Sequence, residues 1–472
     1  MLRKTALLTA VALWPVCLTG AADVLTAPPF QTSDRCLACH NGVTTPSGED
    51  ISIGFAWRPG MMANSARDPY WQASVRRETI DHPAARAAIE DECATCHMPM
   101  ARFLSRMAGE KGEIFARLSL DARTPPDPVA IDGVSCSLCH QTSPEKFGSR
   151  ESFVGGFVIA DPGRPGERPA YGHFAVDAGR ARIMSSSSGF RPAEAGHLGE
   201  SELCATCHTL FTHALGPDGQ VIGEFPEQVP YLEWLHSGYR GMQSCQDCHM
   251  PVVKEPAPVT SVLGVLRERV SRHRFLGGNF FMQRLLNRFR KELHVVSPAP
   301  ELESAALRTV AHLQTEAARV AIESVALRGG RLETTVFVEN LGGHKLPTAY
   351  PSRRAWLHFV VRDRHGRTVF ESGAVNERGA IEGNDNDADP LRYEPHYAEI
   401  TVPSQVQIYE PIMADAAGAV TTGLLRGVRY LKDNRLLPRG FDKGTANKDI
   451  AVAGRAAEDQ DFTGGGDRIR YS

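Results

Sequence analysis

Cysteine is scarce in this chain and unevenly placed. Only 11 of the 472 residues are cysteine, and none follows Cys248. Ten of them occur in closely spaced pairs, and the remaining one, Cys17, lies near the N-terminus. The end of the last pair therefore marks the main change in composition along the chain.

Long apolar runs and runs of basic residues are also missing. After the first 22 residues, no stretch is long and apolar enough to span a bilayer. No cluster of Lys and Arg forms a patch typical of binding to nucleic acid or anionic lipid, and the formal net charge is only −3. These absences argue against a transmembrane span and against nucleic acid as a partner.

The N-terminus has the pattern of a secretory signal peptide. Arg3 and Lys4 precede an apolar stretch at residues 5–18, and small residues follow at 20–22. We therefore expect residues 1–22 to be removed on export, and Cys17 with them. The mature chain would then lie in the bacterial periplasm or outside the cell.

What the sequence does contain is one pentapeptide repeated five times. Cys-x-x-Cys-His occurs at residues 36–40, 93–97, 136–140, 204–208 and 245–249. It is the attachment signature of c-type haem, in which both thiols bond to the haem and the His supplies one axial nitrogen to iron. Zinc and iron–sulfur sites need other spacings and no His after every pair. The sequence predicts five haem c groups, held covalently by Cys36, Cys39, Cys93, Cys96, Cys136, Cys139, Cys204, Cys207, Cys245 and Cys248, with His40, His97, His140, His208 and His249 as proximal iron ligands.

Each haem iron also has a second axial position, and its occupant decides between electron transfer and ligand binding. Histidines outside the motifs are the candidates, although a lone His is more often an ordinary hydrogen-bonding residue. Those near a motif or in a suitable loop rank highest. The expected distal ligands are His82, His197, His273 and His344; His236 and His213 rank lower, and His173, Met61 and Met62 lower still.

The segment carrying the motifs is too small to form an ordinary core around five haems. We expect a pentahaem domain at residues 23–300, built of helices and loops and folded around the porphyrins. Helices are predicted at 68–79, from Pro83 toward Cys93, and at 280–293, whereas residues 141–199 are expected to form loops or short strands.

The sequence pattern changes toward strands in the C-terminal part. Residues 301–317 predict a linking helix, and residues 318–472 predict a β-rich domain. Short strands on either side of Gly329 and Gly330, and others after them, favour an immunoglobulin-like sandwich, with an irregular end at 431–472. The expected fold is an α-helical, loop-rich multihaem domain followed by a mainly-β domain, which is α+β overall.

Several short sequence stretches besides the five motifs are distinctive. They are Met-Met-Ala-Asn-Ser-Ala-Arg-Asp-Pro at 61–69, Cys-His-Met-Pro at 96–99 and 248–251, the segment around His273, and His-Lys-Leu-Pro-Thr at 344–348. In these the chain resembles multihaem cytochromes c of the kind typified by the nitrifiers' tetrahaem cytochrome. The resemblance implies closely paired haems and mostly bis-His irons, which favours His82, His197, His273 and His344. If His344 is a ligand, the C-terminal region must dock on the haem segment.

The first functional hypothesis is an exported electron-transfer protein. Its partners would be a redox donor and a redox acceptor, with haem-lyase or cytochrome c maturation machinery for assembly. Such a protein needs no acid or base, and no nucleophile motif or phosphate loop suggests an enzyme.

Two alternatives remain open. One is a periplasmic oxidoreductase acting on nitrite or hydroxylamine; many pentahaem nitrite reductases replace one motif His by Lys, whereas all five motifs here end in His. The other is a subunit of an extracellular haem assembly that docks through its C-terminal region.

The acidic loop at residues 384–389 offers oxygen ligands of the kind that calcium prefers. It lacks the spacing and the terminal Glu of a calcium-binding loop. A solvated turn is therefore the favoured interpretation, with calcium as the alternative.

Overall fold

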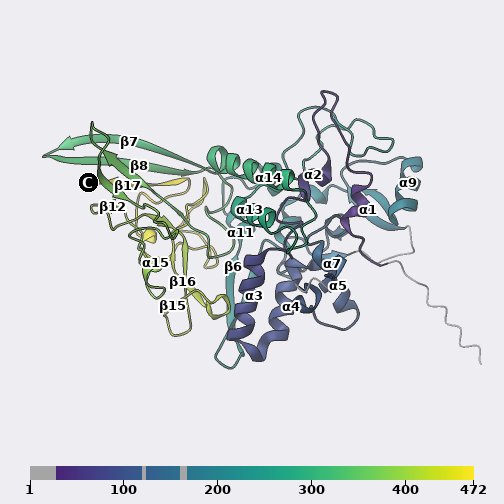
Figure 1. Ribbon diagram of the computed structural model, residues 1–472, viewed down its shortest axis with the longest axis horizontal. Coiled ribbons are helices and arrows are strands. Elements are labelled where there is room, and N and C mark those ends of the chain that lie inside the picture. Colours follow the sequence, from purple (N-terminus) through teal and green to yellow (C-terminus); the bar gives the residue numbers. More distant parts are fainter. Residues whose placement is uncertain (1–27, 120–123, 160–166) are drawn as a thin grey trace, which may run out of the picture.

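The computed structural model describes residues 28–119, 124–159 and 167–472. The predicted signal peptide falls outside these residues. Helices and loops occupy one end of the elongated molecule, strands occupy the other, and α13 (Phe280–Arg288) and α14 (Ala299–His312) lie between them (Figure 1). The domain boundaries expected near residues 300 and 317 stay predictions.

Local sequence explains the helical hairpin that precedes the second motif. The Asp68 side chain accepts hydrogen bonds from the backbone N–H groups of Tyr70 and Trp71, and Pro69 occupies the first turn, so α3 (Pro69–Asp81) begins there. Pro83 then opens the 3₁₀ turn η1 (Pro83–Ala85), which continues into α4 (Arg86–His97). Both predicted helices are confirmed, and α4 carries the second motif at its C-terminal end.

The other helices of the motif-bearing segment are mostly short. They are α1 (Ser33–Leu37), α2 (Ile53–Trp57), α5 (Pro99–Met107), α6 (Ile114–Arg117), α7 (Pro128–Ile131), α8 (Cys136–Cys139), η2 (Arg150–Ser152), α9 (Ala178–Ser188), η3 (His197–Gly199), α10 (Ser201–Ala205), α11 (Pro230–Leu235) and α12 (Cys245–His249). Its strands are β1 (Thr142–Ser143), β2 (Val158–Ile159), β3 (Arg168–Gly172), β4 (Phe190–Glu194), β5 (Leu210–Leu215) and β6 (Val221–Gln228), paired as β1–β2, β3–β4 and β5–β6.

The prediction of loops and short strands for residues 141–199 was wrong at one element. Helix α9 lies within that stretch, begins after the capping side chain of Asp177, and ends at Gly189 in the left-handed conformation. Asp177 and Gly189 are ordinary helix start and stop residues. The last four residues of the helix are serines, which favoured a loop in the sequence-based prediction.

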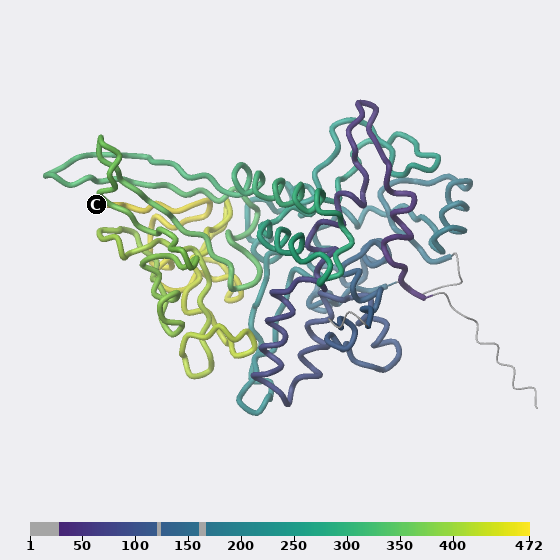
Figure 2. Tube along the Cα trace, in the orientation of Figure 1, coloured from purple at the N-terminus to yellow at the C-terminus, as the bar shows by residue number. Residues whose placement is uncertain are grey.

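Segments far apart in the sequence pack together at the helical end. Val43 and Ile51 share a small core with Val253, Ala257 and Val270. In Figure 2 the purple N-terminal segment accordingly runs beside the teal segment that follows the fifth motif. The segment that follows the first motif therefore packs against the segment that follows the fifth.

The β-rich part begins with the predicted hairpin. β7 (Ala318–Arg328) and β8 (Arg331–Asn340) pair antiparallel around Gly329 and Gly330, whose φ angles of 57° and 81° require residues that tolerate the left-handed region. α14 leads into this hairpin through the π-helical turn η4 (Leu313–Ala317). The remaining elements are β9 (Ala355–Trp356), β10 (Phe359–Arg362), β11 (Thr368–Ser372), α15 (Asp385–Ala388), β12 (Glu399–Ile400), β13 (Ile408–Tyr409), β14 (Pro411–Ala414), β15 (Val420–Thr421), η5 (Leu424–Arg426), β16 (Arg429–Asp433), η6 (Arg455–Ala457) and β17 (Gly466–Tyr471).

Strand pairing defines several small sheets rather than one large one. The largest has the order β12-β17-β8-β7; the others are β15-β14-β16, β10-β11 and β13-β9. This is a mixed α+β fold, and the immunoglobulin-like sandwich stays a prediction. The expectation of an irregular end holds for most of residues 434–465 but was wrong at β17, which lies inside the largest sheet and buries Ile469 against Val336 and Val338.

Among the described residues, no helix combines the length and the apolar character needed to cross a membrane.

Candidate haem-binding site

Residues of all five pentapeptides line one large cavity. Its volume is about 2240 Å³, and its lining includes all ten motif cysteines and all five motif histidines. A site for one small molecule usually measures about 300–1,000 Å³. The cavity is therefore large enough for several bulky groups, and its lining is mostly apolar apart from these ligands.

Each motif histidine is presented from a helical turn. In the first, third and fourth motifs, the His backbone N–H donates to the carbonyl of the first cysteine, over 2.9–3.1 Å. The histidines of the second and fifth motifs are also part of a helical turn, because α4 and α12 both end at the motif histidine. The short helix places two thiols and one imidazole on the same side of the cavity wall.

Most motif histidines are fixed in one orientation by a hydrogen bond. The Nδ1 atoms of His40, His97 and His140 lie 2.7, 3.0 and 2.6 Å from the carbonyl oxygens of Val259, Ser65 and Tyr171, and Nδ1 of His249 bonds to the carbonyl of Leu276. A carbonyl can only accept, so Nδ1 carries the proton and Nε2 keeps its lone pair for a metal.

Burial keeps the rings of three motif histidines in the neutral form that binds metals. It lowers the pKa of His97 and His208 to about 4. The pKa of His249 is also lowered to about 4, by burial first and by the neighbouring His344 second. A neutral imidazole is the form that ligates iron.

Two predicted distal ligands lie opposite motif histidines inside the cavity. The ring centres of His140 and His273 are 6.3 Å apart with planes inclined by 22°. Those of His249 and His344 are 6.2 Å apart with planes inclined by 10°. All four side chains line the cavity.

These separations suit one metal between each pair. A transition metal binds an imidazole nitrogen at about 2.0–2.1 Å. Since each ring centre lies about 1 Å behind its nitrogen, two imidazoles on opposite sides of one metal have centres about 6 Å apart. Rings stacked directly on each other would be closer, as are Trp71 and His97 at 4.3 Å. The residues present therefore fit haem iron with two axial histidines.

Four of the other distal candidates, His82, His197, His213 and His236, do not line the cavity. His82 is buried, with its Nε2 3.9 Å from Glu78 and without a hydrogen-bond partner in the described part of the chain. Nε2 of His197 lies 2.9 Å from the carbonyl oxygen of Thr142. His236 bonds through Nε2 to the carbonyl of Asp442, and His213 lies beside Glu92 on the surface. A ligand role for these four stays a prediction.

Residues that sequence reasoning ranked low or missed also line the cavity. His173, Met61 and Met62 lie in its wall, as do several arginines, among them Arg272, Arg274 and Arg353. Guanidinium groups are suited to pairing with carboxylates such as haem propionates. The arginines could not be selected from the sequence because nothing in their spacing relates them to the motifs.

Thiols from different motifs meet at three places. Cys136 influences the pKa of Cys36, Cys207 that of Cys96, and Cys245 that of Cys204, so the two thiols of each pair are neighbours. The first motif thus lies beside the third, and the fourth lies beside both the second and the fifth. None of the ten motif cysteines forms a disulfide.

The predicted calcium loop has other partners for its oxygens. Asp387 binds Arg354 at 2.7 and 3.0 Å, and Asp385 binds Arg392 at 3.0 Å. Asn384 caps the short helix α15. These ion pairs account for the acidic side chains without a metal, and calcium stays a prediction.

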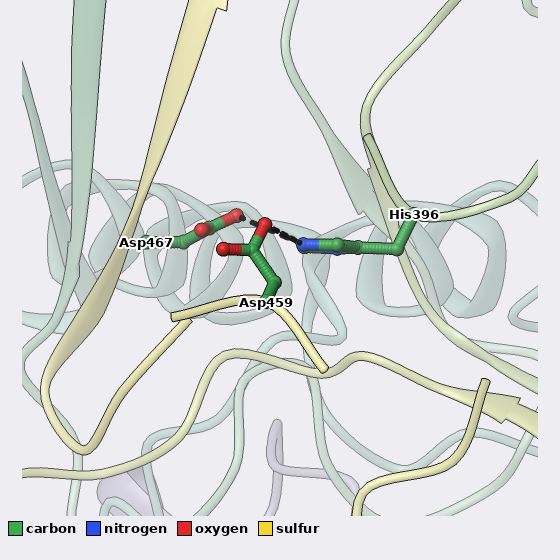
Figure 3. Close-up of side chains that lie close together, drawn as sticks. All are labelled: His396, Asp459 and Asp467. Atoms are coloured by element: carbon green, nitrogen blue, oxygen red, sulfur yellow. Dashed lines mark hydrogen bonds and ion pairs between the residues drawn. The ribbon is translucent and has the colours of Figure 1, made fainter. Parts of the chain in front are cut away.

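Another group of possible metal ligands lies in the β-rich part. His396 Nε2 is 3.2 Å from Asp459 and 3.9 Å from Asp467 (Figure 3). Nδ1 of His396 faces the side-chain amides of Gln407 and Asn434 at 2.8 and 3.1 Å. The oxygens of both amides accept backbone N–H bonds, so their nitrogens must donate to Nδ1. The proton therefore resides on Nε2, and the arrangement favours a hydrogen-bonded network over a metal site, which needs that lone pair.

Five Cys-x-x-Cys-His motifs around one cavity in a mixed α+β fold are the arrangement expected of a multihaem c-type cytochrome. A solved structure that it resembles is the crystal structure of a penta-heme cytochrome c552 from Thermochromatium tepidum, with a TM-score of 0.52 and 17% sequence identity over 87% of this chain and 85% of that chain. At that identity the likeness concerns the fold. No protein-family model and no curated protein matches the chain, and the resemblance to the nitrifier group stays a prediction.

Proposed function

We propose that this chain is an exported pentahaem c-type cytochrome that transfers electrons. The observation that carries the proposal is the convergence of all ten motif cysteines and all five motif histidines on one cavity. Haem iron supplies a one-electron couple when bound there. Its redox donor and acceptor, and its place in the periplasm or outside the cell, belong to the same proposal.

The axial ligands form part of the proposal. His140 with His273, and His249 with His344, would each hold one iron between two imidazoles. In His344, as in four motif histidines, Nδ1 faces a backbone carbonyl, here that of Lys345 at 3.0 Å, which leaves Nε2 for the metal. Two axial nitrogens leave no open coordination position, which suits electron transfer better than substrate binding.

The contacts between motifs support electron transfer among the haems of the second, fourth and fifth motifs. The fourth motif neighbours both the second and the fifth through the cysteine pairs 96–207 and 204–245. Groups attached at these positions would lie side by side. The protein's own contribution is to fix their order and to set the surroundings of each one.

Mass spectrometry of the exported, mature protein tests the proposal. We expect a polypeptide that begins after residue 22 and carries five haem groups. Replacing both cysteines of one motif by alanine should remove one haem. Paramagnetic resonance of the oxidised protein, with and without nitrite or hydroxylamine, tests the role. Low-spin iron that neither compound alters supports electron transfer, whereas a high-spin signal that shifts on addition would favour the oxidoreductase.

A further inference from the structure

Four charged side chains are buried together where the motif-bearing segment meets the β-rich part. Glu233 comes from α11, Lys345 from the loop after β8, and Asp433 and Arg435 from the end of β16 and the residues after it. Their exposed fractions are at most 4%. Two positive and two negative charges give a network without net charge.

The contacts within this network are short and specific. Lys345 Nζ donates to Asp433 at 2.6 Å, and the guanidinium of Arg435 binds both oxygens of Asp433 at 2.8 Å. Arg435 also forms an ion pair with Glu233 at 2.9 Å. Burial by itself would raise the pKa of Asp433, but Arg435 and Lys345 outweigh it and hold that pKa far below the ordinary value.

Glu233 also holds the segment that directly follows His344. One of its carboxylate oxygens accepts the backbone N–H of Lys345 at 3.1 Å and the hydroxyl of Thr348 at 2.7 Å. Lys345 is therefore held twice, by its backbone to the motif-bearing segment and by its side chain to the β-rich part. Its carbonyl faces the imidazole of His344.

Hydrogen bonds and close packing also restrict the residues before His344. Asn340 donates from one side-chain amide to the carbonyls of His344 and Leu436, at 2.8 and 2.9 Å. Gly343 lies so close to α11 that an added Cβ would come within 3.2 Å of the Trp234 ring. The loop has little freedom to move His344 away from His249.

From this geometry we propose that Glu233, Lys345, Asp433 and Arg435 position His344 as the second axial ligand of the fifth haem. The inference rests on the proposed function. Breaking a buried ion pair by removing one partner leaves an uncompensated charge, which strongly favours local rearrangement. The network acts through His344 and touches no iron itself, so its members are positioning residues.

The test uses the five-haem protein and the variant Glu233→Gln. Glutamine has the same shape as glutamate, but it lacks the negative charge that pairs with Arg435. Its amide oxygen is also a weaker hydrogen-bond acceptor for Lys345 and Thr348. We expect one of the five irons to lose its low-spin signal and to bind added cyanide at least tenfold faster, while the other four stay unchanged. Added imidazole should restore the low-spin signal, because it replaces a misplaced ligand.

Two further variants separate positioning from stability. Lys345→Met with Asp433→Leu removes opposite charges together and leaves no lone charge from that pair in the interior, so the protein stays folded for measurement; we expect the same change at one iron. Asp459→Asn weakens the contact between Asp459 and His396 drawn in Figure 3, which lies in the same part of the molecule; in the described part of the chain, neither residue is hydrogen-bonded to residues 340–348. It should lower the unfolding temperature and leave all five iron signals unchanged.

The outcomes distinguish this inference from the proposed function. If the unmodified exported protein carried no haem, the proposed function would be contradicted. Five haems with no spectral change in His344→Ala would contradict the ligand assignment, and with it the positioning role. A change in His344→Ala but none in Glu233→Gln would overturn the positioning role alone. An equal spectral change in Asp459→Asn would also overturn it, because general loosening would then explain the effect.

Discussion

The imidazoles of His249 and His344 face each other across the cavity, with ring centres 6.2 Å apart and planes within 10° of parallel. One belongs to the fifth motif and the other to the loop that follows the first β-hairpin. A direct stack would bring the rings closer, so their spacing fits a metal between them.

Removing a distal histidine should therefore change one iron and no other. In His344→Ala or His273→Ala, we expect one of five low-spin signals to become high-spin, with all five haems still attached. Paramagnetic resonance and mass spectrometry measure the two quantities. The matched control is His365→Ala, since His365 lies in an exposed turn and its ring accepts a hydrogen bond from the neighbouring Arg364. If the spectrum of a distal variant equals that of this control, the ligand assignment is wrong.

Acid should release the ligands only at low pH. Burial lowers the pKa of His97, His208 and His249 to about 4, below the usual value near 6.5. A lowered folded-state pKa stabilises the protein above the unfolded value, and this contribution is lost as the pH falls toward 4. Binding to iron favours the neutral ring further, so the low-spin spectrum should persist at pH 5. Half-loss of that spectrum near pH 6.5 in an absorbance titration would contradict the expectation.

A buried carboxyl should make one reduction potential depend on pH. Burial raises the pKa of Glu227 to about 7, an effect that its hydrogen bond from Thr212 only partly opposes, and Glu227 lies near Cys93 and Cys96 of the second motif. As the pH rises through 7 the carboxyl ionises, and its negative charge favours oxidised iron. The potential of that haem should therefore fall with rising pH, by at most about 59 mV per pH unit.

The variant Glu227→Gln should remove this dependence in a spectroelectrochemical titration. Glu224→Gln is the control, because Glu224 lies on the same strand but is exposed and paired with Arg150. An unchanged slope in Glu227→Gln would show that another group titrates.

The last strand should matter for stability. Ile469 on β17 is fully buried in the main core of the β-rich part, whereas Arg470 beside it is exposed. Ile469→Ala should lower the free energy of unfolding by about 2–5 kcal/mol because it leaves a cavity. Arg470→Ala should have a far smaller effect. Denaturant unfolding followed by far-ultraviolet circular dichroism compares the two, and equal effects would place β17 outside the core.

Several of these features could be predicted from sequence because their signals are local. The motifs, the start of α3 at Asp68 and Pro69, and the turn at Gly329 and Gly330 each depend on a few neighbouring residues. His273 and His344 could be chosen because they lie in short distinctive segments.

The features that escaped prediction depend on contacts between distant residues. Lys345 and Asp433 are 88 positions apart, and nothing in either segment indicates that they form an ion pair. β17 looked irregular because its glycine-rich, polar sequence becomes a strand only when it pairs with β8. His82 and His197 are near motifs in sequence but do not line the cavity, and their ligand role stays a prediction. Proximity along the chain is a weak guide where the ligand comes from another part of the molecule.

The separation of His249 and His344 along the chain also determines when coordination can be completed. The fifth motif is synthesised well before the loop that faces it, and that loop is held by residues from β16, further on. The spectrum of one iron would then report whether the β-rich part has folded, which provides an intrinsic optical probe of maturation.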